Sequence, residues 1–321
     1  MESILRIRLG AVTLFLSLLF ACGPRGGKCV SPAAREFPRA EAPSLYGAQE
    51  RLAWTAGHFW DRFTDTAEAF ACDSALVNGV ALEQVESQMG AFATLLRQVP
   101  PGEGVKAVSR LFDRAEAFER KYPETNVFEE LCRLTRDYLY DPNSPVRNED
   151  LYQPFVARLS ESDLLDDGYR KGYAWDARMC SLNRVGTPAT DFAFTDTEGR
   201  VRTLYGIRAD YVLLIFGNPG CKACRDLMEA MGSTPEIAAL VTGGRLQVVD
   251  IYIDQEIDDW KAHVSEYPAD WINGYDHNYL IRTDLLYNVR GIPSIYLLDA
   301  SKTVLMKDAV EDDVLTALMN L

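Results

Sequence analysis

The chain is poor in the residues and patterns on which most metal and nucleic-acid sites depend. It has three histidines in 321 residues, no cysteine after Cys224, and a single pair of cysteines spaced two residues apart. A structural zinc site needs four nitrogen or sulfur ligands, so the sequence predicts no metal site. The formal net charge of −14 disfavours nucleic acid and anionic membrane surfaces as partners.

Long apolar runs are also missing after the first 22 residues, because no later run approaches the ~20 residues that span a membrane. At the start, two arginines precede the apolar run Leu9–Phe20, which is followed by Ala21-Cys22. This arrangement is typical of a bacterial lipoprotein signal. We therefore predict a signal over residues 1–22, a lipid anchor on Cys22, and a position in the cell envelope, facing the periplasm from the outer or inner membrane. Ordinary secretory cleavage near Ala21 is the alternative.

Composition and periodicity divide the rest of the chain into three parts. Residues 23–46 are rich in Gly, Pro and Ala and predict a flexible tether. Residues 47–184 carry apolar side chains at intervals of three and four and predict an all-α domain. Its expected helices are Leu52–Phe70, Val80–Val99, Val105–Tyr122, Val127–Tyr140, Glu149–Leu159 and Leu164–Asn183.

This helical domain has no recognisable catalytic pattern. Its most distinctive loop is Leu139–Asp150, which is either an ordered connection between helices, the interpretation we favour, or a recognition surface. Three cysteines in or near its predicted helices are expected to be buried as small apolar side chains, whereas Cys29 lies in the tether. The three are Cys72, Cys132 and Cys180.

From residue 185 to residue 321, short strands and helices alternate. The segment Asp254–Leu286 has no clear periodicity and is expected to be a long excursion. Expected strands are Phe192–Thr195, Arg200–Leu204, Tyr211–Phe216, Leu246–Ile253, Ser294–Leu298 and Thr303–Lys307, and expected helices are Cys221–Met231, Pro235–Val241 and Glu311–Leu321.

The stretch Tyr211–Met228 (YVLLIFGNPGCKACRDLM) carries the chemistry. It predicts a buried strand, a tight turn, and a cysteine pair at the start of a helix. The free N–H groups and the positive dipole end of that helix favour thiolate, the form that attacks disulfides. We therefore predict Cys221 as the nucleophile and Cys224 as its resolving partner. The charge of Lys222 would favour the thiolate too, or else belongs to a solvated helix face.

The carboxy-terminal part resembles the thioredoxin fold in its TlpA- and ResA-type branch. The stretches that carry the resemblance are VGTPATDFAFTDTEG, LLIFGNPGCKAC, VVDIYID and NVRGIPSIYLLD. The helical part, through LYDPNSPVRNEDLY and RMCSLNRVGTPATDF, resembles lipoproteins of Bacteroidetes-type bacteria in which a DUF5106 domain precedes a thioredoxin-like domain. The resemblance implies an α+β protein: an all-α domain over residues 47–184 followed by an α/β thioredoxin-like domain over 185–321 with a central mixed sheet.

The same resemblance implies further site residues. The Ile292–Pro293 bond is expected to be cis and to lie beside Cys221, with the backbone of Ile292 available to an extended substrate chain. Gly220, Lys222 and Ala223 would surround the pair, and Gly220 stands where relatives typically carry Trp.

The acids of the best-known relatives are missing from their expected positions. Ile215 stands where thioredoxin carries a buried acid, and Leu227 stands where ResA carries one. Asp250 in a predicted strand and Glu229 on the predicted helix are the acids at hand, and the sequence assigns neither as a proton acceptor.

The predicted function is an exported thiol–disulfide oxidoreductase, acting as reductase, oxidase or isomerase. Its expected partners are exported protein disulfides or thiols, and net reduction in an oxidising compartment needs a membrane-linked thiol–disulfide electron donor. No cofactor is expected. The alternative is a binding lipoprotein whose helical domain docks a partner and whose cysteine pair is a structural disulfide. A thiol peroxidase fits less well, because GNPGCKAC lacks the Pro/Thr-rich surroundings typical of a peroxide-reducing cysteine.

Overall fold

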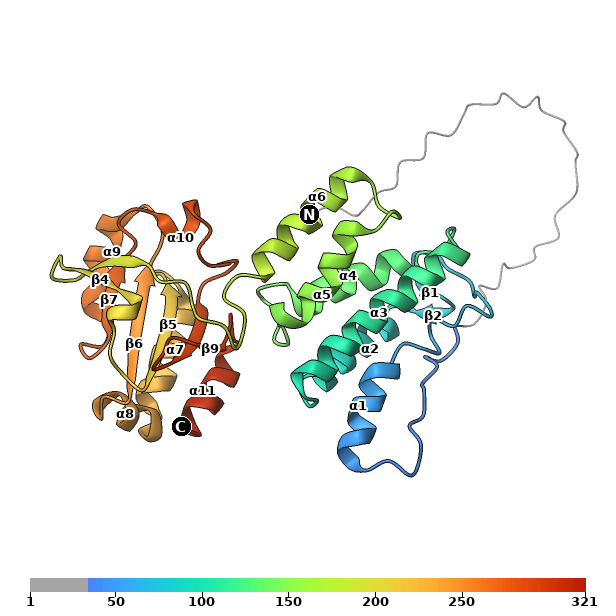
Figure 1. Ribbon diagram of the computed structural model, residues 1–321, viewed down its shortest axis with the longest axis horizontal. Coiled ribbons are helices and arrows are strands. Elements are labelled where there is room, and N and C mark those ends of the chain that lie inside the picture. The colour runs from blue at the N-terminus through green and yellow to red at the C-terminus, as the bar shows by residue number, and fades with distance from the viewer. Residues whose placement is uncertain (1–33) are drawn as a thin grey trace, which may run out of the picture.

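The structure, a computed structural model, describes residues 34–321 and consists of a helical domain followed by a sheet domain (Figure 1). The predicted signal, with Cys22 and Cys29, lies outside the described residues. Among residues 34–321, no helix has the length and apolar character needed to cross a membrane. The α+β fold class predicted from the sequence is confirmed.

The helical domain contains six helices between Ala48 and Cys180. Their apolar faces meet in one core that is rich in aromatic rings; Phe112, for example, meets both Phe128 and Phe155 edge-on. Rings packed edge to face bury large apolar areas and add a favourable quadrupole interaction. The helices are α1 Ala48–His58, α2 Leu82–Leu96, α3 Pro101–Lys121, α4 Val127–Leu139, α5 Glu149–Glu161 and α6 Asp167–Cys180.

The prediction of one helix over Leu52–Phe70 is wrong, since α1 ends at His58. Arg114 of α3 explains the early end: its guanidinium donates to the backbone oxygens of Asp61 and Thr64 at 2.7 and 2.8 Å. A tertiary donor thus satisfies carbonyls that the helix would otherwise use, and the chain turns away. A short hairpin that the sequence did not indicate follows, made by β1 Leu76–Val77 and β2 Val80–Ala81.

Part of the predicted tether is bound to the helical domain. Phe37 is buried and stacks on Phe63, with ring centroids 5.2 Å apart. Just before it, the backbone N–H of Arg35 donates to the oxygen of Gly79 in the β1–β2 turn at 2.8 Å. An aromatic side chain in a tether of small and polar residues was the local sign that this stretch packs.

The sheet domain is built on seven strands in the order β4-β3-β7-β6-β5-β8-β9. The inner strands β5, β6 and β7 run parallel, and the outer strands pair antiparallel, so the sheet is mixed as predicted. The strands are β3 Ala193–Asp196, β4 Val201–Thr203, β5 Tyr211–Gly217, β6 Leu246–Tyr252, β7 Ile272–Tyr275, β8 Ser294–Asp299 and β9 Val304–Met306.

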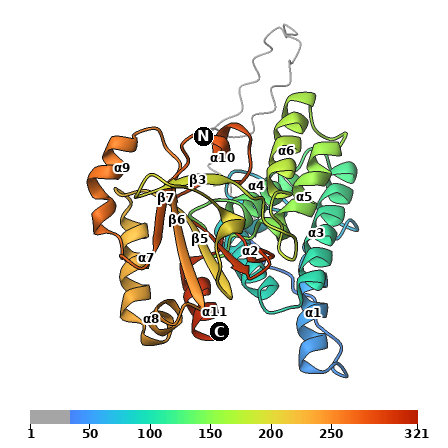
Figure 2. The same cartoon turned by 60° about the vertical axis from the view of Figure 1, so that its left-hand side comes forward.

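Each face of this sheet has its own core. On one face, Leu213, Ile215 and Val248 pack with apolar residues of α7, α8 and α11; α7 and α8 lie together beside the strands (Figure 2). On the other face, Phe216 and Tyr296 pack with Tyr287 and the loops around it. The helices are α7 Lys222–Ser233, α8 Pro235–Thr242, α9 Ile257–His263, α10 Leu280–Thr283 and α11 Glu311–Met319.

The interpretation of Asp254–Leu286 as an excursion is wrong. This segment contains α9, α10 and the central strand β7, which joins β6 to β3. Its Asn273-Gly274 pair has the composition of a turn, but a Cβ on Gly274 would lie 2.6 Å from Cδ2 of Phe194. Glycine is therefore present because a neighbouring ring packs directly on the strand backbone.

Candidate active site

The cysteine pair stands where β5 ends and α7 begins, as predicted. Asn218 shapes the turn between β5 and α7. Its side-chain oxygen accepts from the N–H of Gly220 at 2.9 Å, and its backbone oxygen accepts from the N–H of Cys221 at 3.0 Å. The Asn218 amide also donates to Asp254 at 3.2 Å. These bonds fix the angle at which the chain enters the helix, and therefore the position of the first cysteine.

Cys221 is the residue that caps α7. Its Sγ accepts a hydrogen bond from the backbone N–H of Cys224 at 3.1 Å, and its side chain is partly exposed. An N–H donor and the positive end of a helix both stabilise negative charge on sulfur. The geometry therefore presents an accessible sulfur at the positive end of a helix.

Cys224 differs from Cys221 in its surroundings. It is 4% exposed, and burial raises the pKa of its thiol well above the ordinary range, with a further increase from the hydrogen-bonded Cys221 side chain. Both cysteines are free thiols in the structure. The two thiols are thus not equivalent. Cys221 is accessible to a sulfur of another molecule, whereas Cys224 is buried behind Cys221.

The structure brings the distant Ile292–Pro293 pair to this cysteine. The bond between the two residues is cis, as the resemblance implied, and the Cys221 thiol donates to the backbone oxygen of Ile292 at 3.5 Å. The pair precedes β8, which lies beside β5 in the sheet. The partners of Cys221 therefore come from residues three and 71 positions away.

The residues around the pair contribute less than the sequence suggested. The ammonium group of Lys222 pairs with Asp226 one turn along α7 at 2.6 Å, on the exposed side of the helix, and Asp226 raises the pKa of that ammonium. Its charge is thus directed at a surface carboxylate. Ala223 follows within the first turn, and Gly220 is exposed just before the cysteine.

Asp250 is the site residue to which the sequence assigned no role. It is 2% exposed, its Oδ1 has no hydrogen-bond partner among residues 34–321, and burial raises its pKa to about 8. On β6 it pairs in register with Ile215 of β5, and its charge raises the pKa of Cys224 further. A carboxyl in an otherwise apolar strand beside the cysteine-bearing strand was the available signal.

Gly217 leaves the room that this carboxyl needs. A Cβ at Gly217 would collide with the Asp250 side chain, at 2.9 Å from Oδ1. Gly217 lies two residues after Ile215, so both face the same side of the sheet as Asp250. The last residue of β5 and the acid on β6 therefore fit together directly beneath the turn that carries the cysteines.

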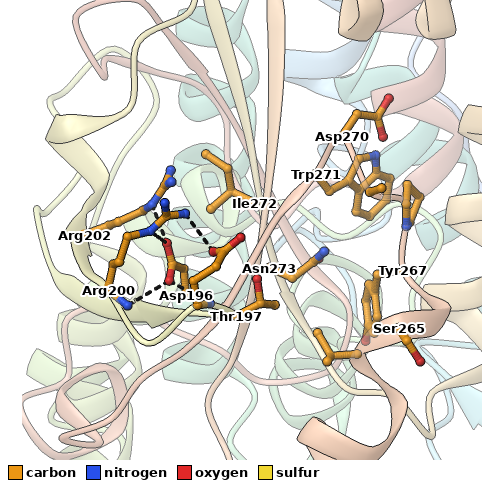
Figure 3. Close-up of a pocket in the computed structure, with 14 residues that line it drawn as sticks. Asp196, Thr197, Arg200, Arg202, Ser265, Tyr267, Asp270, Trp271, Ile272 and Asn273 are labelled. Carbon is orange, nitrogen blue, oxygen red and sulfur yellow. Dashed lines mark hydrogen bonds and ion pairs between the residues drawn. The ribbon is translucent and has the colours of Figure 1, made fainter.

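A separate cavity of about 560 Å³ lies between the β3–β4 hairpin and residues 264–273 (Figure 3). Asp196 on its wall accepts from both Arg200 and Arg202, at 2.9 and 2.8 Å, so these charges are already paired. Neither cysteine and neither residue of the cis bond lines this cavity. We therefore place the candidate active site at the cysteine pair and not here.

Known proteins with related sequences and structures allow the chain to be classified. A family model described as DUF5106, a domain of unknown function, matches residues 21–177. A thioredoxin-like protein from Bacteroides caccae is 33% identical, over 89% of this chain and 99% of that one, with a TM-score of 0.78. The C-terminal domain of an uncharacterized protein from Bacteroides fragilis is 43% identical, over 42% of this chain and 97% of that one, with a TM-score of 0.41.

A third solved structure, the thioredoxin domain of a thiol-disulfide oxidoreductase from Bacteroides vulgatus, is 22% identical over 43% of this chain and 96% of that one, with a TM-score of 0.38. No curated protein matches the chain. The likeness to the Bacteroides caccae protein extends over both domains and nearly the whole of that protein. The chain belongs to this family of thioredoxin-like proteins and carries a DUF5106 domain in its amino-terminal half.

Proposed function

We propose that this chain is an exported, lipid-anchored thiol–disulfide oxidoreductase that exchanges disulfides through Cys221 and Cys224. The observation that carries the proposal is the asymmetry of the pair. Cys221 is accessible and receives a helix N–H on its sulfur, whereas Cys224 is buried behind it. Membership in a thioredoxin-like family supports the same chemistry.

The reaction proceeds in two exchanges. The Cys221 thiolate attacks one sulfur of a substrate disulfide, forms a mixed disulfide, and releases the other substrate sulfur as a thiolate. Cys224 then loses its proton and attacks Sγ of Cys221, which breaks the mixed disulfide and releases the second substrate thiol. The substrate gains two electrons and the Cys221–Cys224 pair loses them, forming a disulfide.

The direction of net exchange depends on what restores the pair. In an oxidising compartment, a reductase needs a membrane-linked thiol–disulfide donor that returns the pair to thiols. An oxidase needs an oxidant that returns the pair to the disulfide, and an isomerase transfers no electrons overall. The partners we propose are exported proteins that carry disulfides or thiols.

Trapping tests the proposal. A Cys224→Ser variant can form the mixed disulfide but cannot resolve it, so in its own periplasm it should accumulate bound partners that reducing agent releases. Cys221→Ser is the matched control and should trap none, because it lacks the attacking sulfur. If Cys224→Ser also traps none, or if the pair has a reduction potential below about −300 mV, as inert structural disulfides do, the oxidoreductase proposal is refuted.

The anchor is tested separately. Replacing Cys22 by alanine removes the predicted lipidation site, and the protein should then leave the membrane fraction. A Cys22→Ala protein that still fractionates with membranes would rule out lipidation at this residue.

A further inference from the structure

The loop that carries the cis bond is held by the helical domain through buried charged groups. Glu149, the first residue of α5, is 2% exposed, and its Oε1 accepts from Nδ2 of Asn288 at 2.6 Å and from Nε of Arg290 at 2.7 Å. Its other oxygen lies 2.8 Å from Nζ of Lys307. A buried carboxylate with several charged partners has well-defined geometry, because leaving any partner unpaired is costly.

Two further contacts hold residues 288–291, the segment directly before the cis bond, against the helical domain. The guanidinium of Arg290 lies over the ring of Tyr140, 4.2 Å from its centroid. The next residue, Gly291, faces Pro142: a Cβ on Gly291 would lie 2.9 Å from Cβ of Pro142. Residues 288–291 therefore meet α5 and the 140–142 segment of the helical domain, directly before Ile292.

Asp308 holds the loop from its other end. Its carboxylate accepts from Arg290 before the cis bond at 2.6 Å and from the Ser294 hydroxyl after it at 2.8 Å. The helical domain reaches this residue as well, because Arg147 donates to the backbone oxygen of Asp308 at 3.2 Å. Both ends of the cis-bond loop are thus fixed by one network that contains residues of both domains.

Resting on the function proposed above, we propose that the helical domain positions the redox site: Glu149, through Arg290 and Asn288, holds the Ile292 carbonyl against Cys221. Glu149 is a positioning residue, since it touches neither sulfur. The Leu139–Asp150 loop then has a role beyond connecting α4 to α5. Because Gly291 faces Pro142, this loop also lies beside the backbone with which a substrate chain would pair.

The position of the Ile292 carbonyl affects the reactivity of Cys221. The Ile292 oxygen accepts from the neutral thiol at 3.5 Å, and an acceptor of this kind favours the protonated form. When the loop retreats, the neutral thiol loses that partner, while the helix N–H that favours thiolate remains. Releasing the loop should therefore increase the rate at which Cys221 is alkylated near neutral pH, and it should weaken the binding of an extended substrate.

The experiment compares Glu149→Gln with Asp150→Asn. Asp150 is the next residue and also lies at the domain boundary, where it accepts from the Val185 N–H at 3.1 Å, but it does not touch the cis-bond loop. Iodoacetamide alkylation of Cys221 measures its thiolate, and insulin with dithiothreitol as the reductant measures catalysis. Urea unfolding of both variants checks that the fold is retained.

We expect Glu149→Gln to be alkylated at least about threefold faster near neutral pH, which corresponds to a shift of about half a pH unit in the alkylation profile, and to raise KM for insulin with a smaller change in kcat. Asp150→Asn should match the parent protein in both assays. Equal alkylation profiles for the two variants would overturn the proposal. Absence of insulin reduction by the parent protein would count against the oxidoreductase function instead, and the alkylation arm would still decide the positioning role.

A second pair of variants covers the case in which Glu149→Gln unfolds. Gly291→Ala pushes the loop away from Pro142 and should also accelerate alkylation. Adding Pro142→Gly removes the colliding Cβ and should return the rate to within about twofold of the parent protein, since contacting residues are energetically coupled. If Pro142→Gly does not rescue Gly291→Ala, the effect of residue 291 is local to its loop and the helical domain does not transmit it.

Discussion

Replacing Asp250 by asparagine should change how the stability of this protein depends on pH. The substitution keeps the size of the side chain and removes its ability to ionise. Burial raises the pKa of Asp250 from 3.8 to about 8. Between these values the folded protein keeps a proton that the unfolded chain has lost, so the folded state is progressively disfavoured as pH rises.

The magnitude follows from the linkage relation. Each pH unit between the two pKa values costs about 1.4 kcal/mol of unfolding free energy. From about pH 5 to about pH 8 the parent protein should therefore lose ~4 kcal/mol relative to Asp250→Asn. The loss is complete above the folded pKa and absent below the unfolded one. The substitution leaves the neighbouring side chains of Cys221, Cys224 and Tyr267 in place, so the parent protein and the variant differ only in the group at residue 250.

Urea unfolding of the reduced protein at several pH values measures this difference. Glu229→Gln is the matched control, because it removes an exposed carboxylate from α7 and should leave the pH dependence nearly unchanged. A difference between parent and Asp250→Asn that stays constant from about pH 5 to about pH 8 would refute a raised pKa at Asp250. If the unfolding free energy of the parent protein falls relative to that of Asp250→Asn as pH decreases, the shift has the opposite sign.

Three further experiments test packing, two at the site and one in the core of the helical domain. Gly217→Ala should lower the unfolding free energy by ~2 kcal/mol because its methyl group meets the Asp250 carboxyl. The control Gly232→Ala on α7, where the added methyl group has open space around it, should raise the unfolding free energy by about 0.5 kcal/mol. Equal effects of the two substitutions in urea unfolding would contradict the collision. Ile215→Asp in an Asp250→Asn background moves the acid across the register pair and should restore the parent pH dependence, and a flat profile would show that the position on β6 is essential. Phe155→Ala should cost ~4 kcal/mol in the helical core, and a loss under about 1 kcal/mol would show that this core repacks around the deletion.

The strand, turn and helix of the active site could be predicted closely because each signal is local. An apolar run before Asn218-Pro219-Gly220 and a helical pattern after it place the end of β5 within one residue and the start of α7 within one residue. Six helices in the amino-terminal domain were predicted for the same reason. Periodicity reports burial along one element, and these elements each bury one face.

What the sequence missed is set by contacts between distant residues. The end of α1 depends on Arg114 in α3, and β7 was hidden because Gly274 serves the ring of Phe194 and not a turn. The network at the domain boundary joins Glu149 to Arg290, which are 141 residues apart. No window of sequence contains both members of such a pair, so no periodic pattern can indicate it.

Asp250 shows how a comparison by sequence position can miss a physical equivalence. Thioredoxin, one of the proteins that the sequence resembles, carries a buried acid on the cysteine-bearing strand at the position of Ile215 in this chain. Register places Asp250 of β6 directly beside Ile215, and both face the core beneath α7. The electrostatic effect on a buried thiol depends on distance and burial, and not on which strand supplies the charge. Asp250, one strand away from the position of Ile215, therefore raises the pKa of Cys224, as an acid at residue 215 would, and Gly217 is the residue that makes room for it.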